Sequence, residues 1–65
     1  GQVDEYGLLV PVATPGNYVE GEMIRRSLED RGIRATLAQT VDGPRVMVWP
    51  ADVERARQTL RPGSA

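Results

Sequence analysis

The first apolar pattern in the chain is an alternation between residues 6 and 13, where Leu8, Val10 and Val12 occupy every second position. Side chains two residues apart in a β-strand point to the same face, so this segment is predicted to be a strand with these three residues directed inward. Pro11 lies within the run. Because proline has no N–H to donate to a neighbouring strand, this strand is predicted to lie at an edge of a sheet.

A helix is predicted from about residue 17 to residue 31. Asn17 and Glu20 have the spacing of a capping box, and Gly32 followed by Ile33 is typical of a left-handed helix end. Positions three and four apart share one face of a helix. The inward face is therefore predicted to carry Gly21, Ile24 and Leu28.

Two other features of this helix carry predictions. Glu22 and Arg26 are four residues apart and are predicted to form an exposed ion pair. Gly21 lowers helix stability by about 0.5–1 kcal/mol relative to alanine. Its lack of a side chain is predicted to permit close approach of the second helix.

Residues 33–39 and 45–49 alternate in the same way as the first strand, with an Asp-Gly turn signal between them. They are predicted to form an antiparallel hairpin. In the third strand, Val46 and Val48 are predicted to point inward. The residues left on the opposite side are Arg45, Met47 and Trp49.

The last predicted element is a helix that begins at Pro50 and ends near Arg61. Proline suits the first turn of a helix, and acidic and basic side chains gather near its two ends as the helix dipole favours. Its narrow apolar stripe consists of Val53, Ala56 and Leu60.

The predicted element order is β-α-β-β-α, with both helices on one face because only one side of each strand is consistently apolar. A right-handed crossover makes strands one and two parallel, and the hairpin inserts strand three between them, which gives the order 1-3-2. The predicted fold is an α+β, ferredoxin-like half. One domain of residues 1–65 is expected, with an ordered core over about 6–61 and flexible termini.

Composition excludes several functions. The 65 residues include no cysteine, histidine or lysine, so the chain lacks the usual neutral-pH base, the thiol nucleophile and the Schiff-base amine. We therefore expect no enzymatic activity, no metal and no cofactor. Eight arginines balance nine acidic residues, which disfavours general nucleic-acid binding. The absence of cysteine and of a long apolar run favours a soluble, cytoplasmic protein.

The segments Val19–Ile24, Gly32–Ala35 and Val46–Pro50, followed by an acidic helix with an inward alanine, resemble a small bacterial family. This family of domains of unknown function is described as prokaryotic signal-transducing proteins, and the resemblance covers roughly residues 8–60. It implies regulation or small-molecule sensing by analogy with nitrogen-regulatory proteins of related fold. The chain departs from the family's pattern at Gly21 and Trp49, where alanine and a smaller aliphatic residue are commoner.

The main candidate site is the side of the sheet opposite the helices, where an apolar patch rimmed by arginine would mark an interaction surface. The alternative is that Trp49 folds over the sheet edge or against the N-terminal residues. The candidate residues for binding a protein partner, or a second copy in a homodimer, are Trp49, Met47, Arg45, Arg34, Thr36 and Leu9.

A weaker candidate is the turn before the first helix, where free amides of Gly16, Asn17 and Tyr18 could hold an anion. An ordinary turn and helix cap explains the same residues. Three functions therefore remain open: a regulatory or protein-interaction module, a sensor of a small anionic metabolite, and RNA binding on the open sheet. The third needs several stacking aromatics, and the sheet is predicted to offer one.

Overall fold

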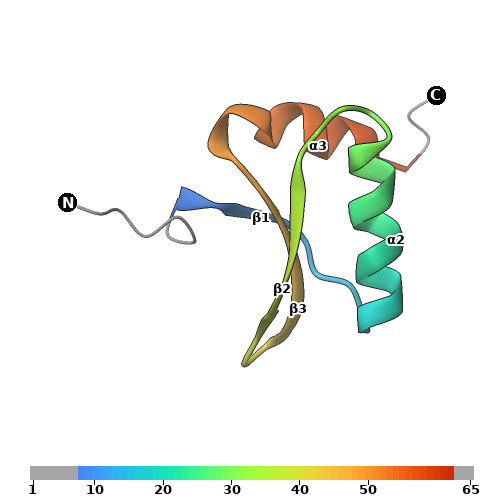
Figure 1. Ribbon diagram of the computed structural model, residues 1–65, viewed down its shortest axis with the longest axis vertical. Helices are drawn as coiled ribbons and strands as arrows, with labels where there is room; N and C mark the ends of the chain where they lie inside the picture. The colour runs from blue at the N-terminus through green and yellow to red at the C-terminus, as the bar shows by residue number, and fades with distance from the viewer. Residues whose placement is uncertain (1–7, 63–65) are drawn as a thin grey trace.

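The computed structural model describes residues 8–62 and contains a three-stranded antiparallel sheet. The strands are β1 (Val10–Ala13), β2 (Ala35–Thr40) and β3 (Gly43–Val48). Their order in the sheet is β1-β3-β2, with β3 antiparallel to both neighbours (Figure 1). The predicted element order, strand order and ferredoxin-like half fold are confirmed.

Two α-helices cover one face of this sheet (Figure 1). They are α2 (Tyr18–Glu29) and α3 (Val53–Leu60), the latter preceded by a 3-10 turn, η1 (Pro50–Asp52). Both helices contribute to a single buried cluster with the central strand. Its members are Leu28, Ile33, Ala35, Val46, Val48 and Ala56.

The phase of β3 agrees with the sequence prediction. Val46 and Val48 are both 0% exposed, and they lie under the helices. Met47, between them, is half-buried. The strand ends at Val48, one residue earlier than predicted, so Trp49 belongs to the connection into η1 rather than to the ladder.

Helix α2 begins and ends as its sequence predicts. Asn17 Oδ1 accepts a hydrogen bond from the Glu20 N–H at 2.8 Å, and Gly32 has φ +80°. The Gly32 and Ile33 amides donate to the carbonyls of Glu29 and Leu28, at 2.9 and 3.0 Å. These two bonds form a Schellman closure, which brings Ile33 back onto Leu28. Regular helix stops at Glu29, two residues before the predicted end.

Gly21 allows a close approach, but to a strand instead of the second helix. A Cβ at this position would lie 2.7 Å from Leu37 Cδ1 and 3.1 Å from Pro15 Cγ. The missing side chain therefore lets α2 lie close against β2. The prediction that it admits the second helix was wrong, because α3 meets α2 elsewhere: Arg55 Nη2 donates to the Arg31 carbonyl at 3.0 Å, just beyond the end of α2.

Strand β1 is shorter than predicted. Leu8 is helical and 47% exposed, so its predicted inward position was wrong, and the strand begins at Val10. The register with β3 shifts between Pro11 and Ala13. This irregularity lets both Val12 and Ala13 pack against the core. The remaining predictions for the termini fall on residues 1–7 and 63–65, which lie outside the described residues.

The hairpin between β2 and β3 turns through Val41 and Asp42. Thr40 Oγ1 donates to the Gly43 carbonyl at 2.8 Å and accepts from the Asp42 N–H at 3.1 Å. Gly43 has φ +109°, a backbone conformation that glycine adopts without a steric penalty. The predicted hairpin is confirmed, with the third strand starting at Gly43 instead of Arg45.

Candidate functional site

The face of the sheet away from the helices can be assigned from strand pairing. Residues directly opposite each other on neighbouring strands point to the same side. Met47 pairs with Pro11 of β1 and Thr36 of β2, and Arg45 pairs with Ala38. Since Val46 and Val48 face the helices, we call the surface formed by Pro11, Thr36, Ala38, Arg45 and Met47 the open face.

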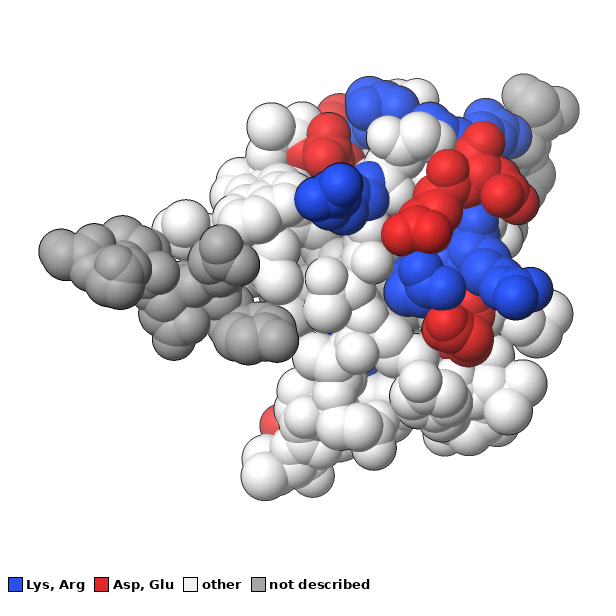
Figure 2. Space-filling model, viewed as in Figure 1, with Lys and Arg blue, Asp and Glu red and all other residues white. Residues whose placement is uncertain are grey.

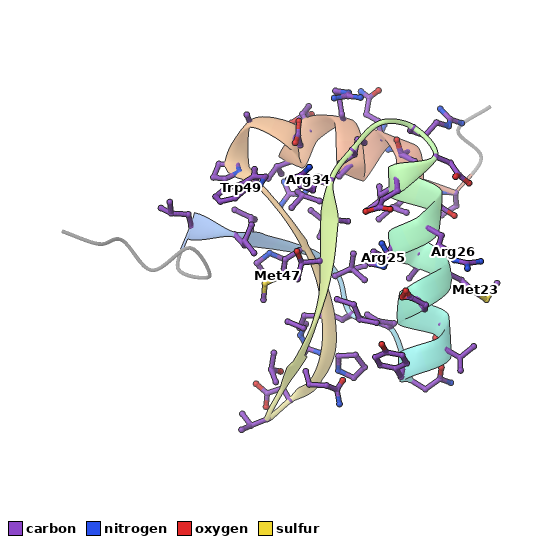
Figure 3. The ribbon with its side chains drawn as sticks, viewed as in Figure 1. Met23, Arg25, Arg26, Arg34, Met47 and Trp49 are labelled. Carbon is purple, nitrogen blue, oxygen red and sulfur yellow. The ribbon has the colours of Figure 1, made fainter. Side chains whose placement is uncertain are left out.

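Three of the six predicted partner-binding residues are thus on the open face: Met47, Arg45 and Thr36. All three are half-buried. The Met47 side chain lies on the side of the sheet away from α2 (Figure 3). Arg45 extends toward the hairpin, where its Nη1 donates to the Pro44 carbonyl at 2.8 Å.

The other three predicted residues lie just outside the strands. Arg34 precedes β2 and is exposed, while Trp49 follows β3 and is half-buried. Figure 3 places both side chains at the same end of the sheet, near the start of η1. Leu9 is half-buried and precedes β1, two positions before Pro11. The structure therefore brings Trp49 and Arg34 to one end of the open face, with Met47 nearer its middle.

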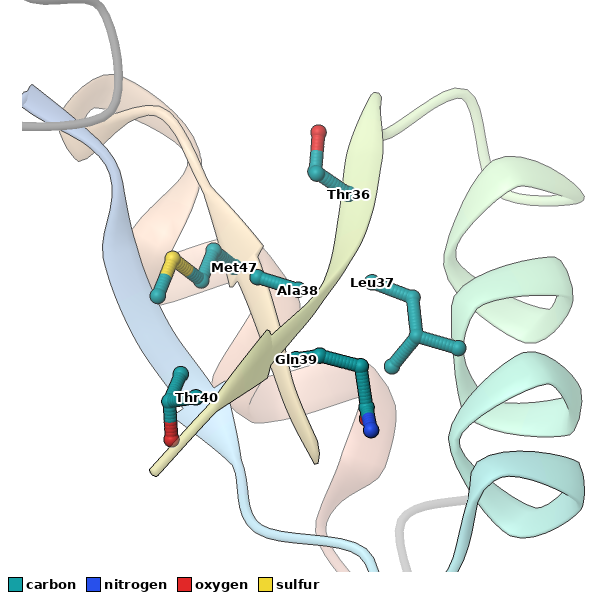
Figure 4. A pocket seen from close by; sticks show the side chains of 6 residues that line it. All are labelled: Thr36, Leu37, Ala38, Gln39, Thr40 and Met47. Atoms are coloured by element: carbon teal, nitrogen blue, oxygen red, sulfur yellow. The ribbon is translucent and has the colours of Figure 1, made fainter. Parts of the chain in front are cut away.

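A shallow hollow of about 500 Å³ lies along β2. Met47 and Thr40 point to one side of the strand, and Leu37 and Gln39 point to the other, toward α2 (Figure 4). Because its lining alternates between the two faces, the hollow follows the free edge of β2. Its lining residues are Thr36, Leu37, Ala38, Gln39, Thr40 and Met47.

Charged side chains gather over the helices in the view of Figure 2, whereas the β2–β3 hairpin is almost uncharged. Within α2, Arg25 binds two acidic neighbours, Glu22 at 2.7 Å and Glu29 at 3.1 Å. The predicted pairing of Glu22 with Arg26 was therefore wrong. Arg25 is three residues after Glu22 and four before Glu29, and its side chain binds both carboxylates, whereas the Arg26 side chain points away from the sheet (Figure 3).

The hydrogen bonds from Arg25, assisted by its charge, lower the pKa of Glu22 below the usual carboxyl value. A lowered pKa in the folded state means that the ionised carboxylate stabilises the fold above its unfolded pKa. This contribution disappears as the pH falls through the folded pKa. We predict that Arg25→Gln raises the pKa of Glu22 toward its usual value, as measured by carboxyl NMR titration. Arg26→Gln is the matched control and should change it far less; equal shifts would contradict the observed pairing.

The turn before α2 uses its polar groups internally. The Gly16 N–H donates to Glu20 Oε1 at 2.9 Å, and Asn17 caps the helix through the Glu20 N–H. The Glu20 carboxylate therefore lies at the position where a bound anion would be expected. Tyr18, the third candidate residue, is exposed. This arrangement favours the helix-cap interpretation over an anion site.

Sequence reasoning proposed no binding surface on α2, yet Val19 and Met23 are exposed on its outer side and Tyr18 on a flank. Tyr18, Val19 and Met23 are 58%, 68% and 65% exposed. Val19 and Met23 are four residues apart and lie off the inward stripe, so their helical spacing could have revealed them. Met23 points away from the sheet (Figure 3).

Among residues 8–62 no polar or charged residue is fully buried, and no three acidic side chains cluster in a way that could hold a metal ion. In the same part of the chain, every helix is too short or too polar to cross a membrane.

Comparisons with protein-family models, with curated proteins and with solved structures find no match to this chain. The resemblance to the prokaryotic signal-transducing family therefore stays a prediction.

Proposed function

We propose that this protein is a non-catalytic regulatory or protein-interaction module of the bacterial cytoplasm, and that its open face binds a protein partner. The observation that carries this proposal is Met47. This apolar side chain lies on the central strand, on the face that neither α2 nor α3 covers. Methionine adapts its shape to irregular partners and is enriched at interfaces.

Two further features support a protein partner. Trp49 and Arg34 lie at one end of the same surface, and tryptophan and arginine often dominate binding energy in protein interfaces. The face between them and the hairpin carries small, uncharged side chains at Thr36 and Ala38. A surface with an apolar side chain at its middle, an aromatic residue at one end and arginine side chains beside it fits a protein surface better than a small polar ligand.

The test uses three variants: Met47→Asp and Trp49→Ala at the proposed surface, and Met23→Asp as the matched control with the same substitution on a different surface. We expect Met47→Asp and Trp49→Ala to weaken capture of a partner from the source organism's lysate by about tenfold or more. Met23→Asp, on the outer side of α2, should leave capture unchanged. Circular dichroism should show all three variants folded. Loss of capture with Met23→Asp alone would move the site to α2 and contradict the proposal.

The two alternative functions have less support. A sensor of an anionic metabolite would have to displace the Glu20 carboxylate from the start of α2. RNA binding on an open sheet requires several stacked aromatics, and the open face has only Trp49 at its border among the described residues.

A further inference from the structure

The two edges of the sheet differ in how well they are protected. The strand order places β1 and β2 outside and β3 in the centre. An edge strand presents unpaired N–H and C=O groups, and natural proteins shield such edges with proline, bulges, charged residues or short strands. Strand β1 has four residues, contains Pro11 and shifts its register. Strand β2 has six residues, Ala35–Thr40, pairs with β3 without a shift, and contains neither proline nor a charged residue.

The free edge of β2 also has room for an extended chain beside it. The 500 Å³ hollow is lined by five consecutive residues of β2 together with Met47 (Figure 4). A strand added at this edge would bond its backbone to β2 and place its side chains above and below the sheet. The edge therefore has the form of a strand-pairing site.

We propose that β2 pairs antiparallel with β2 of a second copy, joining the two sheets into one. A two-fold axis perpendicular to the sheet makes the strands antiparallel and keeps the helices of both copies on the same side. The pairing uses the backbone N–H and C=O groups at the edge of β2, whereas the proposed function uses side chains of the open face. The two proposals share Thr36 and Ala38 but can be tested separately.

The residues along β2 are complementary to themselves in one register. With Ala38 on the axis, Thr36 of each copy lies opposite Thr40 of the other, and threonine pairs are favourable across strands. Ala38, whose side chain is a single methyl group, then lies opposite Ala38 of the second copy at the axis. Leu37 lies opposite Gln39, so no like charges face each other along the paired strands.

The same register brings opposite charges together at both ends. Arg34, just before β2, comes level with Asp42 of the second copy, in the turn after β2. Both residues are exposed, and neither forms an ion pair with another residue of 8–62. Centring the pair on Leu37 instead would place Arg34 opposite Thr40 and lose both ion pairs. Charge complementarity thus selects a second copy over an arbitrary peptide.

The test is sedimentation equilibrium of charge-swapped variants over a wide concentration range. The wild-type chain should form a dimer that weakens with added salt. Arg34→Glu or Asp42→Arg alone should raise the dimer dissociation constant by about tenfold, because each creates two like-charge contacts. The double variant R34E/D42R should restore the wild-type value. Arg57→Glu, on the exposed side of α3, is the matched control and should leave dimerisation unchanged.

Three results would overturn the proposal. The first is a wild-type chain that remains monomeric at about 1 mM. The second is a double variant that is as weak as the single ones, since rescue is the signature of this register. The third is a dimer that resists the charge swaps but dissociates with Met47→Asp, which would show that copies associate through the open face. Loss of partner capture with Met47→Asp while the charge-swap pattern persists would leave the edge proposal intact.

Discussion

Val46→Asp is expected to unfold the protein, whereas the same change at the next residue, Met47→Asp, should leave it folded. Val46 is fully buried within the core cluster, and a carboxylate there would have no partner. Burying an unpaired charge costs more than the roughly 5 kcal/mol available to a small domain. Circular dichroism at 25 °C should show loss of helical signal for Val46→Asp alone.

The comparison also tests the phase of β3, on which the open face depends. Met47→Asp points to the other side of the sheet, where the carboxylate stays in water, and its expected cost is below about 1 kcal/mol. Unfolding by Met47→Asp alone would show that the assigned faces are reversed, and equal effects of the two substitutions would show that both faces of β3 are covered to the same degree.

Leu28→Ala is expected to lower the free energy of unfolding by about 2–5 kcal/mol, as urea denaturation would measure. Leu28 is fully buried where the closure of α2 folds Ile33 back onto it, so truncation leaves a cavity between helix and sheet. The matched control is Leu8→Ala at a residue that is 47% exposed, and its cost should be below about 1 kcal/mol. A small effect of Leu28→Ala would mean that the core can collapse around the missing side chain.

The two proposed surfaces are compatible with each other. A two-fold axis perpendicular to the sheet places both open faces on the same side of the joined sheet. A partner with two copies of its own binding site would then be held by both faces and gain affinity through effective concentration. Pairing at β2 leaves Met47, on the central strand, free to contact that partner.

The candidate site was only partly predictable from the sequence. The alternation around Val46 and Val48 identified the face that carries Met47, because strand phase is a local property of the pattern. The position of Trp49 was harder to predict from the sequence, since Pro50 and the 3-10 turn end the strand before it. The exposure of Val19 and Met23 was not predicted, because helical spacing places them off the inward stripe but does not show whether another segment covers them.

Local signals in the sequence determined the elements of this protein, their order and the faces they bury. Helix caps such as Asn17 and Gly32 depend on residues a few positions away, and strand alternation repeats every two residues. Both can be recognised without knowing which distant segments pack against them. The tertiary structure alone decided which partners meet across the fold. Gly21 faces Leu37, Arg55 reaches the end of α2, and a register shift protects β1 while β2 stays exposed. These outcomes depend on how closely distant segments pack, which no local pattern encodes.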